Sequence, residues 1–115
     1  MNQTNGYIYI RNHSSYDDNN ACKMGKAMNI PERDSQYATS EIKRGYFDPV
    51  FEVSIEKMNI IERLLQNEFQ ELNIRYNAGT EFYKREIIHR IEPYLITIGV
   101  KYKKLLNDEI NNLVR

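Results

Sequence analysis

The chain has little of what stabilises small secreted or zinc-dependent proteins. Cys22 is the only cysteine among its 115 residues, which excludes an internal disulfide and a zinc site built from several thiolates. The two histidines, His13 and His89, lie too far apart in the sequence to form a metal-ligand motif by spacing. The longest apolar run, residues 94–100, is much shorter than the roughly 20 residues that span a bilayer, and the first residues do not resemble a secretion signal. We therefore expect an intracellular protein without structural zinc and without a membrane partner.

An excess of charge of either sign is also lacking. Sixteen Lys and Arg residues balance sixteen Asp and Glu residues, and the sequence pI is about 6.7. Many nucleic-acid-binding proteins are basic, because neutralising phosphates supplies much of their affinity, so this balance argues against tight non-specific binding. Basic residues still gather locally, and the group nearest the N-terminus consists of Lys23, Lys26, Arg33, Lys43 and Arg44. The basic residues between positions 84 and 104 are interpreted as solvated helix faces.

The N-terminal half has the pattern of a β-hairpin followed by a helix. Hydrophobic residues make up 41% of the chain and charged residues 28%, as is typical of one small globular domain. Residues 6–12 alternate in the manner of a strand, residues 13–20 form a polar loop, and residues 21–26 return as an antiparallel strand. Asn29 is a helix-capping residue type, which predicts a helix over 31–42 with proline in its first turn.

The C-terminal half is expected to be mostly helical. After a turn at Asp48-Pro49, residues 50–55 alternate like a third strand, and apolar spacing predicts a helix from there to about residue 75. Residues 77–80 form a turn and 81–83 an extended segment, after which Pro93 divides a helical tail into two helices. The fold class is therefore α+β, with a small antiparallel three-stranded sheet flanked by helices. Residues 1–84 form the main domain, and residues 85–115 a helical extension packed on it.

Two short motifs resemble a known nuclease family. Gly6-Tyr7-Ile8-Tyr9, followed after one loop by Lys23-Met24-Gly25, resembles the paired motifs of the GIY-YIG endonuclease superfamily. The resemblance is greatest to a phage and large-virus branch of single-domain members, with motifs close to G-Y-[IV]-Y and K-I-G-[KR]-T. It covers roughly residues 6–84 and implies a metal-dependent endonuclease acting on DNA, with RNA left open. For a viral protein, the site of action would be the cytoplasm or nucleus of the host.

The resemblance also implies a set of site residues. Arg33 corresponds to the family's helix arginine, which contacts the scissile phosphate, and Glu62 to the glutamate that holds a single Mg²⁺ or Mn²⁺. Tyr37 follows Arg33 by one helical turn, so both side chains can address one site. The resemblance further implies Gly6, Gly25, Asn77 and Glu81 as motif-supporting residues. The local basic group described above adds Lys26, Lys43 and Arg44 for nucleic-acid binding.

The residue that activates water is left open between three candidates. Lys23 occupies the place of the second motif's tyrosine and could act as the base or bind phosphate directly. Tyr7 and Tyr9 both stand near the place of the first motif's tyrosine. We expect them on opposite faces of the strand, so that only one reaches the site, and the branch pattern favours Tyr7.

A second interpretation is a catalytically inactive GIY-YIG-like module that binds nucleic acid or another protein. The altered motif tyrosines and the zero net charge favour this alternative. The stripe formed by Tyr94, Leu95, Ile98 and Tyr102 at helical spacing either belongs to the core or joins two copies in a homodimer through the C-terminal helices.

Overall fold

The computed structural model describes residues 3–76 and 79–114 as an α+β fold built on one antiparallel sheet. The six strands lie in the order β4-β5-β2-β1-β3-β6. Their bounds are β1 (Asn5–Asn12), β2 (Ala21–Ala27), β3 (Tyr46–Ser54), β4 (Asn73–Tyr76), β5 (Gly79–Lys84) and β6 (Lys103–Lys104). The predicted α+β class is confirmed, and β1, β2 and β3 form the predicted core of the sheet. The expectation of only three strands is wrong, because β4, β5 and β6 extend the sheet at both edges.

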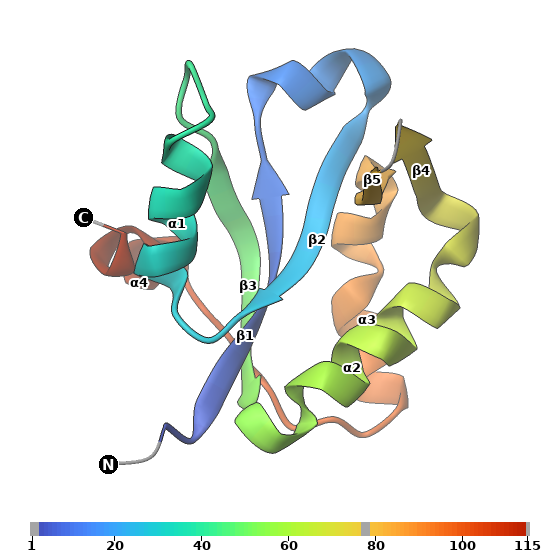
Figure 1. Ribbon diagram of the computed structural model, residues 1–115. Coiled ribbons are helices and arrows are strands. Elements are labelled where there is room, and N and C mark those ends of the chain that lie inside the picture. The colour runs from blue at the N-terminus through green and yellow to red at the C-terminus, as the bar shows by residue number, and fades with distance from the viewer. Residues whose placement is uncertain (1–2, 77–78, 115) are drawn as a thin grey trace.

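Helices cover both faces of the sheet (Figure 1). On one face lie α1 (Ile30–Ala38) and α4 (Asn107–Leu113), and on the other α2 (Ile55–Glu68) and α3 (Ile91–Thr97). Three short 3₁₀ segments connect these elements: η1 (Ser14–Asn19), η2 (Gln70–Leu72) and η3 (Arg85–His89). The site residues expected on α1 and α2 are therefore held on opposite sides of the sheet.

The central strand β1 contributes to the core on both faces, because successive side chains of a strand alternate. Ile8 and Ile10 pack in the core under α2 and α3, whereas Tyr9 packs in the core under α1 and α4. Tyr7 packs against the same core as Tyr9. The expectation that the two tyrosines face opposite ways is wrong, since residues two positions apart in a strand share a face.

The extra strands next to β2 come partly from a segment that we expected to be helical. We expected a helix to continue to residue 75, but α2 ends at Glu68 and the chain passes through η2 into β4. β4 then pairs with β5 in a hairpin, and β5 pairs with β2 through Lys23 and Phe82. The residues from Ile74 onward include types with high β propensity, which favour this strand pairing over a helix. The expected extended segment at 81–83 is confirmed as part of β5.

The segment between α1 and β3 also differs from the prediction. α1 ends at Ala38 and not at residue 42, and β3 begins at Tyr46, so Asp48-Pro49 lies inside a strand and not in a turn. The pairing of β3 with β1 is irregular at this point, between Tyr9 and Arg11. Proline is tolerated in a strand where the ladder is interrupted, because its missing N–H is not needed there.

The C-terminal tail packs on the same sheet. Pro93 lies in the first turn of α3, as predicted, but the long helices expected over 84–115 are replaced by η3, α3, β6 and α4. Leu95 is fully buried, and the ring of Tyr102 lies 5.6 Å from that of Phe51. These two members of the predicted stripe therefore pack within the domain, and a homodimer stays a prediction. In the part of the chain that the structure describes, no helix is both long enough and apolar enough to cross a membrane.

Candidate active site

The candidate site lies where β2 runs past the end of β5. Among the described residues, β5 pairs with β2 over Ala21–Lys23, and the rest of β2 continues between α1 and α2 (Figure 1). Side chains alternate along β2, with Met24 in the core on the α2 side and Ala27 in the core on the α1 side. Lys23 and Gly25 therefore share the α1 side with Ala27, whereas Lys26 shares the α2 side with Met24.

Two tyrosine hydroxyls meet on the α1 side of this strand. Tyr9 Oη and Tyr37 Oη are 3.0 Å apart, and the two rings pack edge to face. Burial raises the pKa of Tyr9, while the hydrogen bond from Tyr37 and the charge and hydrogen bond of Arg33 act in the opposite direction. Burial also raises the pKa of Tyr37, and the neighbouring Tyr9 and Glu81 add to this rise. The structure thus brings Tyr9, Arg33 and Tyr37 together.

Lys23 joins this group from β2. Its Nζ lies 5.3 Å from the centre of the Tyr37 ring and 5.0 Å from that of Phe82. Aromatic faces attract a positive charge, so the two rings hold the Lys23 ammonium beside the tyrosine pair. This arrangement suits a cation that binds a phosphate group.

Glu62 approaches from the opposite side, on α2. Its carboxylate forms an ion pair with Lys26, with 3.2 Å between Oε1 and Nζ, and its side chain is 18% exposed. Lys26 also donates a hydrogen bond to Asn59 Oδ1 at 2.6 Å. Within the described ranges, no hydrogen bond or ion pair joins Glu62 to Arg33 or Lys23. Glu62 and Lys26 therefore form a second group, separated from the tyrosine pair by β2.

Tyr7 lies apart from both groups. Burial raises its pKa, and the adjacent Glu52 raises it further by charge and by accepting a hydrogen bond. Glu52 belongs to β3, next to Tyr7 in the sheet register. The structure places Tyr9, and not Tyr7, beside Tyr37 and Arg33.

Both predicted glycines allow a close approach. A Cβ on Gly25 would lie 2.7 Å from Tyr9 Oη and 2.8 Å from Tyr9 Cζ, because the Tyr9 ring crosses directly over the glycine that pairs with it. A Cβ on Gly6 would lie 2.5 Å from the sulfur of Met58 on α2. Gly25 thus makes room for the hydroxyl that meets Tyr37, and Gly6 makes room for the helix that carries Glu62.

Replacing Gly25 by alanine is expected to destabilise the protein by about 1–3 kcal/mol, because the Tyr9 ring would be forced out of a packed position. Urea unfolding measures this effect. Gly25→Ala combined with Tyr9→Ala is the matched test: if the clash with Tyr9 is the cause, adding the alanine at position 25 to a Tyr9→Ala background costs much less than it does alone. Equal costs in both backgrounds would contradict this explanation.

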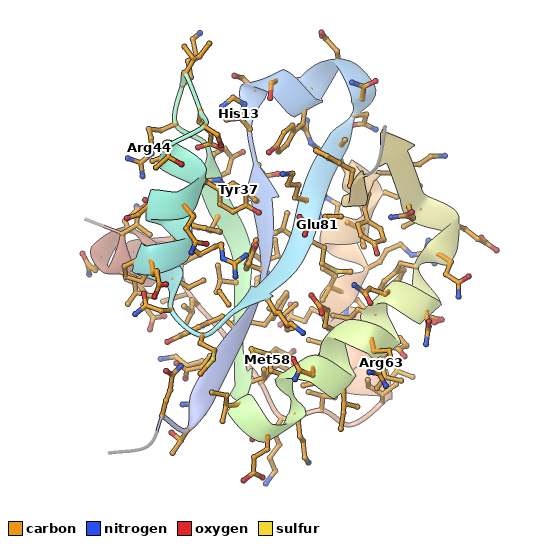
Figure 2. The ribbon with its side chains drawn as sticks, in the orientation of Figure 1. His13, Tyr37, Arg44, Met58, Arg63 and Glu81 are labelled. Carbon is orange, nitrogen blue, oxygen red and sulfur yellow. The ribbon has the colours of Figure 1, made fainter. Side chains whose placement is uncertain are left out.

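In the view of Figure 2, Tyr37 lies between Arg44 and Glu81. The charge of Glu81 raises the pKa values of Tyr9, Tyr16 and Tyr37, after burial as the main cause in each case. Arg44 forms an ion pair with Asp34 on α1. The carbonyl oxygen of Lys43 lies 2.5 Å from His13 Nε2, and Asn77 lies outside the described residues.

Arg11, which packs against Tyr37, was not predicted from the sequence as a site residue. Arg11 is fully buried, and its guanidinium lies 4.8 Å from the centre of the Tyr37 ring. Its Nη1 is 3.0 Å from Asp34 and its Nη2 is 2.6 Å from Glu41, the two acids that precede and follow Tyr37 in the sequence. The available signal was its position, since Arg11 continues the alternation of Tyr7 and Tyr9 on one face of β1.

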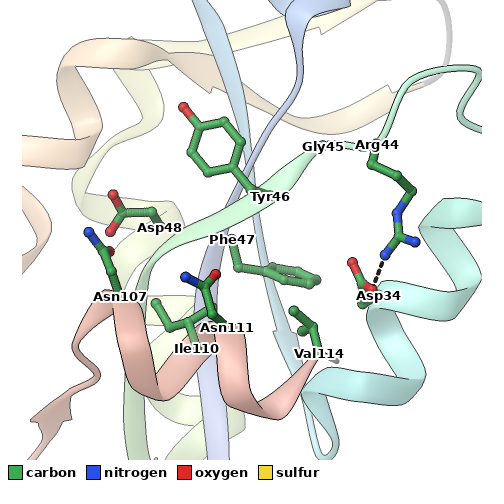
Figure 3. Close-up of a pocket in the computed structure, with 10 residues that line it drawn as sticks. All are labelled: Asp34, Arg44, Gly45, Tyr46, Phe47, Asp48, Asn107, Ile110, Asn111 and Val114. Carbon is green, nitrogen blue, oxygen red and sulfur yellow. Dashed lines mark hydrogen bonds and ion pairs between the residues drawn. The ribbon is translucent and has the colours of Figure 1, made fainter.

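Of the predicted site residues, Arg44 alone lines a hollow beside this network, among the described residues. A cavity of about 350 Å³ lies between α1, β3 and α4 (Figure 3). Its rim carries the Asp34–Arg44 pair, and α4 contributes Asn107 and Asn111. A smaller cavity, of about 260 Å³, includes Arg33 at the start of α1. The candidate site is defined by the contacts around β2 and not by the cavity between α1, β3 and α4.

One comparison with known proteins identifies a family. The sequence model of the T5orf172 domain matches residues 6–101, which extends past residue 84 to include η3 and α3. No curated protein and no solved structure matches the chain. The chain therefore belongs to the T5orf172 domain family, a phage-associated family that is related to endonucleases.

Proposed function

We propose that this protein is a metal-dependent endonuclease that hydrolyses phosphodiester bonds in DNA by a GIY-YIG-type mechanism with one divalent ion. The observation that carries the proposal is the meeting of two hydroxyls and two cations beside β2, in a family related to endonucleases. Phosphodiester hydrolysis requires positive charge at the phosphate oxygens and a group that orients or activates water. Arg33 and Lys23 offer the first, and the pair of Tyr9 and Tyr37 offers the second.

The residues on α2 fit a weakly held Mg²⁺ or Mn²⁺. No cluster of three or more His, Cys, Asp or Glu side chains suited to a metal occurs in residues 3–76 and 79–114. Mg²⁺ is often held by one or two carboxylates together with substrate phosphates and water, so a single carboxylate is sufficient. Glu62 fits this description, because its partly exposed carboxylate already has a cation, Lys26, at ion-pair distance. For this ion and the α1-side residues to act on one phosphate, the phosphate would lie at the edge of β2 beyond Lys23, where side chains from both faces of the strand can reach it. The bound ion would neutralise charge on that phosphate.

The cationic side chains have separate roles in this proposal. Arg33 would donate hydrogen bonds to the non-bridging oxygens of the scissile phosphate, where a planar guanidinium binds well. Lys23, held between two rings, would bind a phosphate oxygen as a point charge. Lys26 would exchange its contact with Glu62 for one with DNA when the metal is present. Each of these roles requires the positively charged form of the side chain.

Tyr9 is the favoured group for handling the proton of the attacking water. Because burial raises its pKa, the Tyr9 hydroxyl holds its proton near neutral pH and can take another only after it has ionised. Arg33 and Tyr37 lower the pKa of Tyr9, so they favour the ionised form that a base requires. An acid opposes ionisation at both residues, Glu81 at Tyr9 and Glu52 at Tyr7, but the charge of Arg33 counteracts it at Tyr9. The surroundings of Tyr9 therefore suit a base better than those of Tyr7.

A nicking assay tests the proposal and the choice of tyrosine together. We expect purified protein to nick supercoiled plasmid with Mg²⁺ or Mn²⁺ and to be inactive in EDTA. Tyr9→Phe should lower the rate about 100-fold, the usual contribution of a positioned acid–base group. Tyr7→Phe, which removes a comparable hydroxyl elsewhere on the same strand, should change the rate less than about threefold. A greater loss in Tyr7→Phe would return the role to Tyr7.

The alternative is a module that binds nucleic acid without cutting it. Its support is the ion pair that already occupies the Glu62 carboxylate, together with lysine in place of the second motif's tyrosine. Under this alternative, no metal elicits nicking, whereas DNA still binds. Parallel assays with RNA of the same sequence decide between the two nucleic acids.

A further inference from the structure

The segment between α1 and β3 presents one apolar side chain entirely to solvent. Ile42 has a relative exposure of 104%, whereas the other exposed large apolar residues range from 38% to 69%. Single exposed apolar side chains are common on protein surfaces, so exposure alone does not indicate a binding role. The surroundings of Ile42 are what distinguish it.

The base of this segment is tied to the rest of the protein on both sides of Ile42. On one side, Glu41 accepts hydrogen bonds from the buried Arg11 at 2.6 Å and from the Gly45 amide at 3.1 Å. On the other, the Lys43 carbonyl oxygen contacts His13 Nε2, and Arg44 pairs with Asp34. Isoleucine itself is stiff at χ1. The segment is therefore anchored on both sides of Ile42, and the Ile42 side chain projects from it into solvent.

Charge and position both favour a nucleic-acid partner for this segment. Ile42 is followed directly by Lys43 and Arg44, and the Arg44 side chain is 58% exposed, so it can contact a phosphate as well as Asp34. The segment starts where α1 ends, and α1 is the helix that carries Arg33 and Tyr37. Figure 1 shows it as a narrow projection beyond the end of α1.

We propose that Ile42 is a wedge that inserts between neighbouring base pairs of duplex DNA beside the point of cleavage, while Lys43 and Arg44 hold the adjoining phosphates. Proteins that distort duplex DNA insert apolar side chains between base steps, which unstacks the bases and kinks the helix. A tethered, branched side chain flanked by cations has the features that such an insertion requires. The choice of DNA as the partner rests on the proposed function, but the insertion itself does not depend on cleavage.

The test measures unstacking without cleavage. Duplexes with 2-aminopurine at successive positions are titrated in EDTA with wild-type protein, Ile42→Ser and Ile96→Ser. Ile96, on α3, is the control because it is also an exposed isoleucine. Wild type and Ile96→Ser should raise the fluorescence severalfold at one step. Ile42→Ser should lose most of that rise, while its affinity falls less than about tenfold, because the phosphate contacts remain.

A second measurement relates the wedge to catalysis. If wild type nicks DNA, Ile42→Ser should nick a continuous duplex about tenfold more slowly and should recover on a duplex that carries a single mismatch at the same step. A wild-type complex without any rise in fluorescence would overturn the wedge and leave the endonuclease intact. An Ile42-dependent rise without nicking would sustain the wedge and reject the endonuclease. Absence of binding to any duplex would overturn the wedge and point to a protein partner for Ile42.

Discussion

Glu62→Gln is expected to lower plasmid nicking about 1,000-fold or more while leaving the protein folded. The proposed site offers a single carboxylate for the divalent ion, and the loss of a metal's charge at phosphorus costs several kcal/mol of barrier height, with about 1.4 kcal/mol for each factor of ten. Glutamine can still accept a hydrogen bond from Lys26, so the packing of α2 is preserved. Because a partly exposed ion pair contributes little, the free energy of unfolding should change by less than about 1 kcal/mol.

The matched control for this variant is Glu68→Gln, which removes an exposed carboxylate from the end of the same helix. It should nick DNA at the wild-type rate, measured at several Mn²⁺ concentrations. DNA affinity in EDTA should be equal or higher for Glu62→Gln, since a negative charge near the phosphate is gone. Full activity in Glu62→Gln would reject the metal site. Inactivity of the wild type with every metal, combined with DNA binding, would support the non-catalytic alternative.

The parts of the site that sequence could predict are those set by local periodicity. Arg33 and Tyr37 share a face of α1 because they are four residues apart, and the structure brings both to Tyr9. Gly25 pairs directly with Tyr9 across the β1–β2 hairpin, so the two motifs meet as the antiparallel register requires. The shared helix face and the hairpin pairing follow from local geometry, whereas the contact of Tyr37 with Tyr9 is a tertiary contact between α1 and the sheet.

The parts that could not be predicted depend on tertiary pairing. Neither the partner of Glu62 nor the ring of Phe82 over Lys23 follows from spacing, because the first joins α2 to β2 and the second requires the pairing of β5 with β2. Arg11 is the clearest case. A buried arginine in a strand breaks the expected apolar pattern, and its acidic partners lie 23 and 30 residues away. The expectation that Tyr7 and Tyr9 face opposite ways failed for a simpler reason, since strand alternation places both on one face.

Arg11→Met is expected to destabilise the protein by about 3–5 kcal/mol, because removing one partner of a buried ion pair leaves charge without compensation. The side chains of Asp34 and Glu41 are each only 8% exposed, so water cannot replace the lost guanidinium. Methionine keeps much of the side-chain length and fills the space beside Tyr37. Urea unfolding followed by circular dichroism measures the loss, and Arg63→Met, at an exposed position on α2, should change stability by less than about 0.5 kcal/mol.

The pH dependence of this loss identifies its cause. Burial alone would raise the pKa of Glu41, but hydrogen bonds from Arg11 and Gly45 and the charge of Arg11 hold it below the usual value. In wild type, the native carboxylate therefore stabilises the fold above the pKa of the unfolded chain, and this stability fades as the pH falls through the lower folded pKa. Without Arg11, burial dominates and the pKa of Glu41 rises, so Arg11→Met should lose stability as the pH rises from about 4 to 7.

The difference in unfolding free energy between wild type and Arg11→Met should consequently be smaller at pH 4 than at pH 7. Adding Glu41→Gln to Arg11→Met should recover part of the loss at pH 7 and little at pH 4, because the amide removes the charge that Arg11 no longer compensates. A loss that is independent of pH and unchanged by Glu41→Gln would mean that Arg11 acts through its packing against Tyr37 and Phe47, and not through its charge.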